Sequence, residues 1–307
     1  MDRIEAMRLF LAVLDTGSQA EAGRRLGHSA PAVSRAIASL ETRLGTPLLH
    51  RTTRSLRLSE AGERYAAACR RILADIEEAD LLAAGERSAP RGMLTLTAPL
   101  VSGARLLRPV LDDFLDSYSE VRARLILLDR PVGLIDEGID IALRIAHLPD
   151  SSLIATRVGE IRRIVVASPR YLAARPALTA PDHLARHACI SLTRFDHDAW
   201  AFSGPDGRQL RVALVPRFVV NGVEAAVASA LEGRGVTRVL SYQVADHVRE
   251  GRLVRLLADA EPPPVPAHLV TPEGRLGVPK VRAFVDFAVP RLRQAFADRA
   301  LPPYSPA

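Results

Sequence analysis

One stretch of the sequence decides the fold of the first part of the chain: residues 17–41, GSQAEAGRRLGHSAPAVSRAIASLE. It has the pattern of two short amphipathic helices joined by a tight glycine turn. This arrangement predicts a helix-turn-helix, a motif that lays its second helix in a DNA major groove.

The second helix of this pair has one apolar face. Its apolar residues recur at i, i+4, i+7 and i+11, a single stripe that must be buried against the preceding helices. These residues are Val33, Ile37, Leu40 and Leu44. The residues expected to face outward are Ser34, Arg35, Ala38 and Ser39. An alternative is a surface helix of an ordinary bundle, whose outward side chains are merely solvated.

The start of the second helix is the end that would approach the bases. Ser29 is a suitable N-cap and Pro31 suits the first helical turn. Arg35 can donate two hydrogen bonds to a guanine edge, whereas the outward serines can contact either a base or a phosphate. The candidate DNA contacts on this helix are Ser29, Ala30, Pro31, Ser34, Arg35 and Ser39.

Residues 48–58, LLHRTTRSLRL, alternate polar and apolar side chains around a polar tip, a pattern that predicts a two-stranded wing. Between Arg24 and Arg71 there are ten arginines and three acids, a local excess of +7 beside a whole-chain net charge of +6. The positive charge is therefore concentrated where DNA would lie. Arg51 and Arg54 are candidates for phosphate or minor-groove contacts, which position a protein more than they specify a sequence.

The segment from Ser59 to about Ala84 has the spacing of a coiled-coil seam, formed by Tyr65, Cys69, Ile72, Ile76, Ala79 and Ala83. This spacing predicts a dimerisation helix. The alternative is a helix packed on its own domain. The small residues of the seam are compatible with this alternative. Cys69 is interpreted as a small core residue and not as a redox thiol. Residues 85–92 are expected to form a hinge.

From Met93 onward, short apolar strands alternate with helices, which indicates α/β sheets. The expected strands are 93–97, 125–128, 140–145 and 163–167, and the expected helices include 105–118 and 223–232. Ligands of such sheets bind beyond the carboxyl ends of the strands. The candidate ligand-binding residues on this basis are Pro99, Val101, Ser102, Asp129, Arg144, Trp200 and Asn221. Trp200 can be an aromatic wall or a core anchor, and Arg144 can pair an anionic ligand or an internal acid such as Asp129 or Asp140.

Composition narrows the class of protein. A chain of 307 residues with 48% hydrophobic residues can form two or three domains. Two cysteines are too few for a disulfide framework, and no leader or run of eighteen apolar residues occurs, so a cytoplasmic protein without membrane association is expected.

Catalytic and metal-binding motifs give little support to an enzyme. The chain has no glycine-rich phosphate loop, Gly-x-Ser-x-Gly elbow or dinucleotide fingerprint. His183, His187 and Cys189 have ligand-like spacing, yet a helix end followed by a strand would turn Cys189 away. We therefore expect no catalysis, no cofactor and no metal.

The first seventy residues closely resemble the LysR-type transcriptional regulators. The matching motifs are Met7-Arg8-Leu9-Phe10-Leu11-Ala12-Val13, Gly17-Ser18, Ala22-x-Arg24-x-Leu26, Pro31-Ala32-Val33-Ser34, Leu40-Glu41, Leu44-Gly45, Pro47-Leu48, Arg51 and Leu58-Ser59-Glu60-Ala61-Gly62. Many members of the family carry glutamine before the Pro-Ala-Val-Ser run, where this chain has Ala30. A base contact made by that glutamine therefore cannot be carried over.

The resemblance implies a winged helix-turn-helix and a long linker helix, followed by an α/β effector domain shaped like a periplasmic binding protein. The expected boundaries are 1–58 for the DNA-binding domain, 59–92 for the linker and 93–307 for the effector domain. Within the last, subdomain I covers 93–166 and 267–300, and subdomain II covers 167–266.

The implied function is sequence-specific regulation of transcription, modulated by a small-molecule effector. The implied partners are a double-stranded DNA operator, the effector and further copies of the chain, as a dimer or as a tetramer made of two dimers. Two alternatives remain: a C-terminal domain that only oligomerises, and a nucleoid-like protein with little sequence preference.

Overall fold

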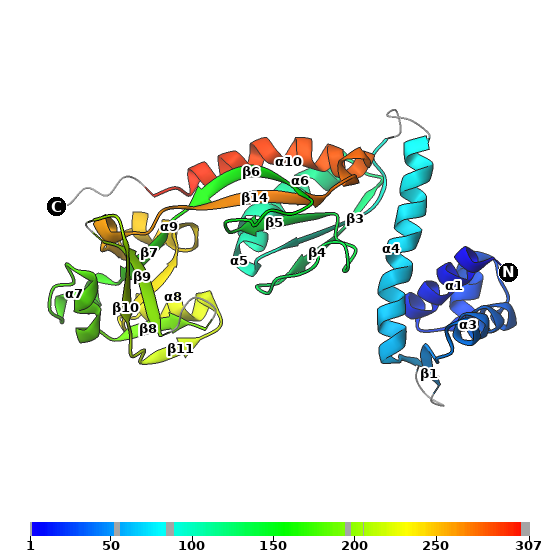
Figure 1. Ribbon diagram of the computed structural model, residues 1–307, viewed down its shortest axis with the longest axis horizontal. Helices are drawn as coiled ribbons and strands as arrows, with labels where there is room; N and C mark the ends of the chain where they lie inside the picture. Colours follow the sequence, from blue (N-terminus) through cyan, green and yellow to red (C-terminus); the bar gives the residue numbers. More distant parts are fainter. Residues whose placement is uncertain (1, 52–55, 84–88, 194–197, 205, 302–307) are drawn as a thin grey trace. The chain divides into compact units, whose positions relative to one another are not determined.

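The computed structural model describes residues 2–51, 56–83, 89–193, 198–204 and 206–301 (Figure 1). The chain divides into two compact units. The first comprises Met1–Thr97, Leu115–Ala142 and Thr271–Phe284, and the second comprises Ala98–Phe114, Leu143–Val270 and Val285–Ala307. Among the described residues, no helix is both long enough and apolar enough to cross a membrane.

The predicted helix-turn-helix is present. It is formed by α1 (Arg3–Thr16), α2 (Gln19–Leu26) and α3 (Ala30–Leu44), which share one apolar core. Gly27 ends α2 in the left-handed conformation, with φ of 74°. A Cβ on Gly23 would lie 2.4 Å from the carbonyl oxygen of His28, so the backbone of the turn approaches α2 as closely as only glycine permits.

The apolar stripe of α3 is shorter than predicted. Val33, Ile37 and Leu40 are buried, but Leu44 is 38% exposed, because the helix ends there at the left-handed Gly45. The prediction that Leu44 continues the buried stripe was therefore wrong.

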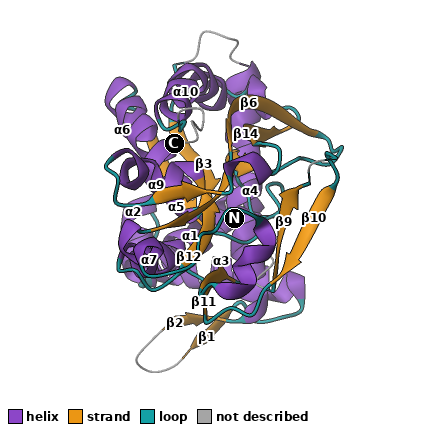
Figure 2. Ribbon diagram, turned by 90° about the vertical axis from the view of Figure 1, so that its left-hand side faces the viewer, coloured by secondary structure: helices purple, strands orange, loops and turns teal. Residues whose placement is uncertain are grey.

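The predicted wing is a short antiparallel hairpin of β1 (Leu49–Arg51) and β2 (Leu56–Leu58) (Figure 2). Glu41 of α3 holds its base, since the Glu41 Oε1 accepts hydrogen bonds from the backbone nitrogens of Leu48 at 2.8 Å and Leu49 at 3.2 Å. Arg54 and the rest of the predicted tip, residues 52–55, lie outside the described residues.

The linker helix α4 (Glu60–Ala83) begins inside the core of the helix-turn-helix. Cys69 is fully buried there, and the ring of Tyr65 lies 5.9 Å from that of Phe10. Further along, Ile76 is half-buried and Ala79 is exposed. The first half of the predicted seam thus packs on its own domain, which was the alternative interpretation, and Cys69 is the small core residue that was expected.

The remainder of the chain forms two five-stranded sheets. The first has the order β4-β3-β5-β14-β6 and the second has the order β11-β8-β12-β7-β13. The first sheet contains β3 (Gly92–Ala98), β4 (Val121–Leu127), β5 (Ile141–Ile145), β6 (Leu153–Ile161) and β14 (Val265–Pro272). The second contains β7 (Arg163–Ala167), β8 (Cys189–Leu192), β11 (Phe218–Val220), β12 (Val236–Leu240) and β13 (Val254–Leu256). The chain passes to the second sheet between β6 and β7 and returns to the first sheet between β13 and β14.

Helices and short turns connect the strands. They are α5 (Leu100–Ser102), the π-helical turn η1 (Gly103–Leu107), α6 (Arg108–Ser117), α7 (Pro169–Ala173), η2 (Pro181–Arg186), α8 (Val223–Leu231), α9 (Ser241–Arg249), η3 (Ala258–Ala260), η4 (Arg275–Gly277) and α10 (Pro279–Asp298). A hairpin of β9 (Ala199–Ser203) and β10 (Gln209–Ala213) forms a further antiparallel pair.

Candidate DNA interface and effector pocket

The exposed face of α3 carries the predicted DNA contacts. The Ser29 hydroxyl accepts a hydrogen bond from the backbone nitrogen of Ala32 at 3.4 Å, which confirms Ser29 as the N-cap. Arg35 and Ser39 are exposed, while Ser34 is half-buried. The outward side chains therefore lie on the face opposite the buried stripe, and the amide end of the helix is held in a defined conformation.

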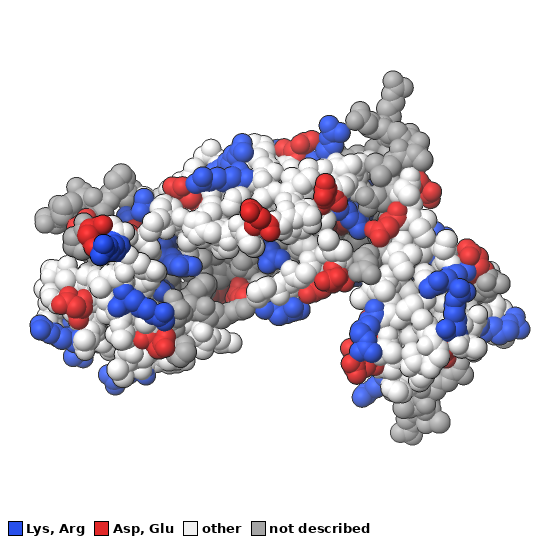
Figure 3. Space-filling model, in the orientation of Figure 1, with Lys and Arg blue, Asp and Glu red and all other residues white. Residues whose placement is uncertain are grey.

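Several arginines of α2 and α4 are paired with neighbouring acids. Arg24 pairs with Glu21, Arg64 pairs with Glu60, and Arg70 lies 3.8 Å from Asp15. By contrast, no described residue forms an ion pair with Arg25, Arg35 or Arg43, all of which are exposed. Figure 3 shows basic side chains on the visible face of this part of the chain. These unpaired cations are the ones available to phosphates.

Arg43 was not among the sequence candidates, although a signal for it exists. No acid stands three or four residues away from Arg43 on α3, so no partner on its own helix can neutralise it. Arg51 lies in β1, and Arg54 lies outside the described residues.

The turn before α3 is tied to α1. The His28 Nε2 lies 3.0 Å from the Glu5 Oε1, and both side chains are half-buried. His28 therefore links the turn before α3 to α1.

The predicted effector residues occupy different environments. Trp200 is 1% exposed in the core beside the second sheet, with the Arg238 guanidinium 5.4 Å from its ring. It is the core anchor, one of its two predicted interpretations. Arg144 is half-buried in β5, Asp129 is exposed after β4, and Asn221 is exposed just before α8.

Part of the predicted loop after β3 is occupied by hydrogen bonds within the loop itself. The Pro99 carbonyl oxygen accepts hydrogen bonds from the backbone nitrogen of Gly103 at 2.7 Å and from the hydroxyl of the buried Ser102 at 3.3 Å. Of the predicted effector residues, Val101 lines a cavity of the second unit, and Asn221 lies two residues before Val223, which lines the same cavity.

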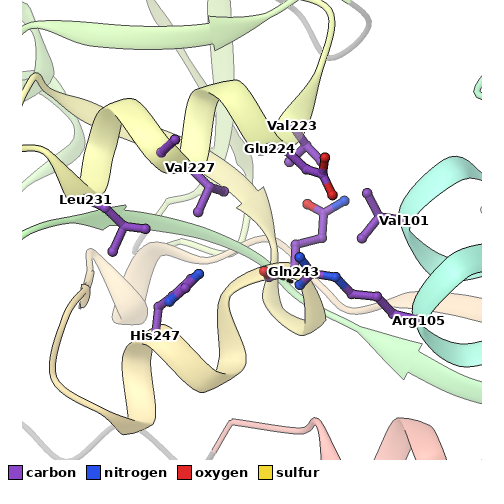
Figure 4. Close-up of a pocket in the computed structure, with 9 residues that line it drawn as sticks. Val101, Arg105, Val223, Glu224, Val227, Leu231, Gln243 and His247 are labelled. Carbon is purple, nitrogen blue, oxygen red and sulfur yellow. Dashed lines mark hydrogen bonds between the residues drawn. The ribbon is translucent and has the colours of Figure 1, made fainter.

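This cavity, which we call the α8 pocket, has a volume of about 200 Å³ and is lined by residues of α5, η1, α8 and α9 (Figure 4). Its aliphatic wall consists of Val101, Val223, Val227 and Leu231, with Ala228 beside them. Its polar residues are Arg105, Glu224, Gln243 and His247. Of these residues only Val101 is predictable from the sequence, because the others come from three separate segments that periodicity alone does not bring together.

The polar residues of the α8 pocket are held by few hydrogen bonds. The Arg105 Nη1 donates to the carbonyl oxygen of Gln243 at 3.2 Å, shown dashed in Figure 4. The Gln243 Oε1 accepts the backbone nitrogen of Leu240 at 2.9 Å. The buried Nδ1 of His247 has no hydrogen-bond partner among the described residues, and burial lowers the pKa of this imidazole. Buried polar atoms without a partner are few in native structures.

The histidine and cysteine cluster near β8 is structural. The Tyr171 hydroxyl lies 3.3 Å from the Nδ1 of His187, and the Cys189 Sγ donates to backbone carbonyls. Burial raises the pKa of the Cys189 thiol to about 11. Within the described ranges, no group of three or more His, Cys, Asp and Glu side chains has the arrangement of a metal site.

Two family models match the chain. One, described as "LysR substrate binding domain", covers residues 87–293, and the other, "Bacterial regulatory helix-turn-helix protein, lysR family", covers residues 4–63. An "HTH-type transcriptional regulator" of Xanthomonas campestris pv. campestris (strain 8004) is 37% identical over 288 residues, or 92% of this chain and 84% of the relative. The regulator CrgA of Neisseria meningitidis serogroup B is 31% identical over 290 residues, or 94% of this chain and 96% of CrgA.

Solved structures agree with these matches. The structure of CrgA, "a LysR-type transcriptional regulator from Neisseria meningitidis", has a TM-score of 0.60 at 31% identity and covers 94% of this chain and 98% of its own. Full-length AphB of Vibrio cholerae, "a member of the LTTR protein family", has a TM-score of 0.62 at 26% identity over 94% of this chain and 99% of its own. The capped helix-turn-helix, the two-sheet region and these matches lead to one conclusion: the chain belongs to the LysR family of transcriptional regulators, with an N-terminal helix-turn-helix domain that binds DNA and a C-terminal effector-binding domain.

Proposed function

We propose that this regulator binds a specific double-stranded operator in the cytoplasm as a dimer or as a tetramer of two dimers, and that it catalyses no reaction. The observation that carries the proposal is the exposed face of α3, on which Arg35 has no described acid to neutralise it. The proposed contacts on α3 are Ser29, Ala30, Pro31, Ser34, Arg35 and Ser39, with Arg51 and Arg54 of the wing on the phosphates or in the minor groove.

The effector is proposed to bind in the C-terminal domain, beside the segment from Pro99 to Ser102 and in the adjoining α8 pocket. A ligand shifts a conformational equilibrium only by its differential affinity for the two states. A ligand that contacts helices on both sides of the α8 pocket loses some of these contacts when the helices move apart. Its affinity therefore differs between the two arrangements. The resulting change, passed through oligomer contacts, would alter the spacing of the DNA-binding domains and the bending of the operator.

A footprint of the purified protein on the DNA upstream of its own gene tests the proposal. The experiment uses excess random competitor DNA and moderate salt. A discrete protected region with two half-sites related by two-fold symmetry is the expected result. Diffuse protection that disappears as competitor or salt rises, here and on genome-wide selected fragments, would instead favour the nucleoid-like alternative.

A further inference from the structure

The α8 pocket contains two opposite charges that do not pair with each other. Arg105 and Glu224 both line it, yet no ion pair joins Arg105 or Glu224 to any described residue. Elsewhere exposed acids pair with arginines, as in Arg108 with Asp112 and Arg157 with Glu160. An acid and a base that face one cavity and stay apart leave room for a ligand that carries both charges.

The rest of the lining restricts the ligand further. Val101, Val223 and Val227 form an aliphatic wall with Leu231, and no Phe, Tyr or Trp ring lines the cavity among the described residues. The cavity volume of about 200 Å³ is below the roughly 300–1,000 Å³ of common ligand pockets, which favours a small ligand. The aliphatic wall and the small volume together favour a small ligand with an apolar side chain over a nucleotide.

The position of Arg105 gives a second reason to assign a ligand here. Arg105 lies in η1, a π-helical turn between α5 and α6. Such turns interrupt the regular hydrogen bonding of a helix and are frequent at functional sites. Only the Nη1 of Arg105 is used, by the Gln243 carbonyl, so the other guanidinium nitrogens can donate to a carboxylate.

We propose that the α8 pocket binds a small aliphatic α-amino acid, an inference that rests on the proposed effector function. The ligand carboxylate accepts hydrogen bonds from Arg105, and its ammonium group donates to the Glu224 carboxylate. Its branched side chain contacts the valines and Leu231.

The test is thermal melting and calorimetric titration of the full-length chain with four probes of nearly the same shape. These are L-leucine, 4-methylvalerate, which lacks the amino group, isoamylamine, which lacks the carboxylate, and L-leucinamide. We expect only L-leucine to raise the melting temperature clearly at millimolar concentration. An equal shift with 4-methylvalerate would overturn the role of Glu224, and no shift with L-leucine, L-valine or L-norvaline would overturn the proposal.

Two variants with matched controls locate the site. Arg105→Ala and Glu224→Gln should each raise the Kd of L-leucine about tenfold or more, because each removes a charged hydrogen bond. Arg108→Ala and Glu232→Gln alter an exposed arginine and an exposed acid nearby that do not line the cavity, so they should leave the Kd unchanged. A Kd that responds equally to the controls would overturn the assigned site. An intact operator footprint beside failed leucine binding would refute this inference alone, whereas leucine binding without a footprint would refute only the proposed operator function.

Discussion

Arg35 is the side chain on which sequence recognition is expected to depend most. It is exposed on α3 and has no described ion-pair partner. A bidentate contact to a guanine is worth about 1–3 kcal/mol of discrimination. We therefore expect Arg35→Ala to weaken binding to the specific operator by that amount and to relax base preference at one position, measured by titration of operator variants.

The matched comparison is Arg54→Ala in the wing. A phosphate contact weakens specific and random DNA about equally when it is lost, and it reduces the salt dependence. If Arg35→Ala lowered affinity for operator and random DNA by the same factor, the assigned orientation of α3 on DNA would be incorrect.

A buried histidine makes the effector domain sensitive to acid. Burial, followed by the neighbouring charges of Arg175 and His183, lowers the pKa of His187 from its ordinary value of 6.5. Below pH 6.5 the unfolded chain therefore binds more protons than the folded chain, so the free energy of unfolding falls as pH drops from that value toward the folded pKa. Burial also lowers the pKa of His247 and His268, which adds to the effect.

Urea unfolding between pH 7.5 and 5.5, followed by the fluorescence of the single, buried Trp200, measures this dependence. His187→Gln should reduce the loss of stability over this range, whereas His50→Gln, at an exposed position in β1, should not. An identical pH dependence in His187→Gln and the unsubstituted protein would contradict the assignment.

At the scale of elements, the turn between α2 and α3 depends on one glycine. A Cβ at Gly23 would lie 2.4 Å from the His28 carbonyl, which forces the turn away from α2. We expect Gly23→Ala to destabilise the helix-turn-helix by about 1–3 kcal/mol, the usual cost of overpacking. Hydrogen exchange of the α2 and α3 amides is the measurement.

Gly222→Ala is the control for this substitution. Gly222 has a negative φ, and its Cβ would meet nothing within 4 Å. Exchange in α2 and α3 should therefore stay unchanged in Gly222→Ala. Unchanged exchange in Gly23→Ala as well would show that the turn can relax.

Elements with a strong local pattern were predictable from the sequence, and irregular ones were not. The helix-turn-helix and α4 follow directly from spacing and caps. The predicted helix 105–118 corresponds to α6 (Arg108–Ser117), but a π-helical turn precedes it, which a 3.6-residue period does not reveal. The predicted strand 125–128 corresponds to β4 (Val121–Leu127), which begins earlier. The start of β4 was missed because it carries Arg122 and Arg124, which are exposed on this edge strand.

At the scale of the molecule, self-association is expected to depend on the second half of α4. Its first half is already used in the core of the DNA-binding domain, whereas Ala79 is exposed on the predicted seam. We expect Ala79→Glu to place charges in the interface between two α4 helices and to shift the chain toward the monomer. Sedimentation of the full-length protein over a range of concentrations measures this.

Ala67→Glu introduces the same charge at an exposed position of α4 away from the seam and should leave the assembly unchanged. If both variants sediment like the unsubstituted chain, α4 is not the dimerisation element. Equal weakening of self-association in the two variants would indicate a general effect of negative charge on the helix.

The α8 pocket, where the effector is proposed to bind, was the part of the molecule least predictable from the sequence. The rule that ligands bind after strand ends led to Val101, but Arg105, Glu224 and His247 meet only through the tertiary fold. Nothing in the spacing of an exposed arginine and a distant glutamate indicates that they face one cavity. On α3, by contrast, each candidate lies within a few turns of one helix, so local periodicity alone places these residues together.

The shared core of α4 and the helix-turn-helix has a practical consequence for protein engineering. Ala66 and Cys69 are buried against α1, and Ile72 and Leu73 pack on the same cluster. A gene fusion that transplants this DNA-reading module onto another receptor, and cuts at residue 58, would leave that cluster open to water. A portable module must extend at least to Leu73, and the helical phase of the junction then becomes the variable that a designer adjusts.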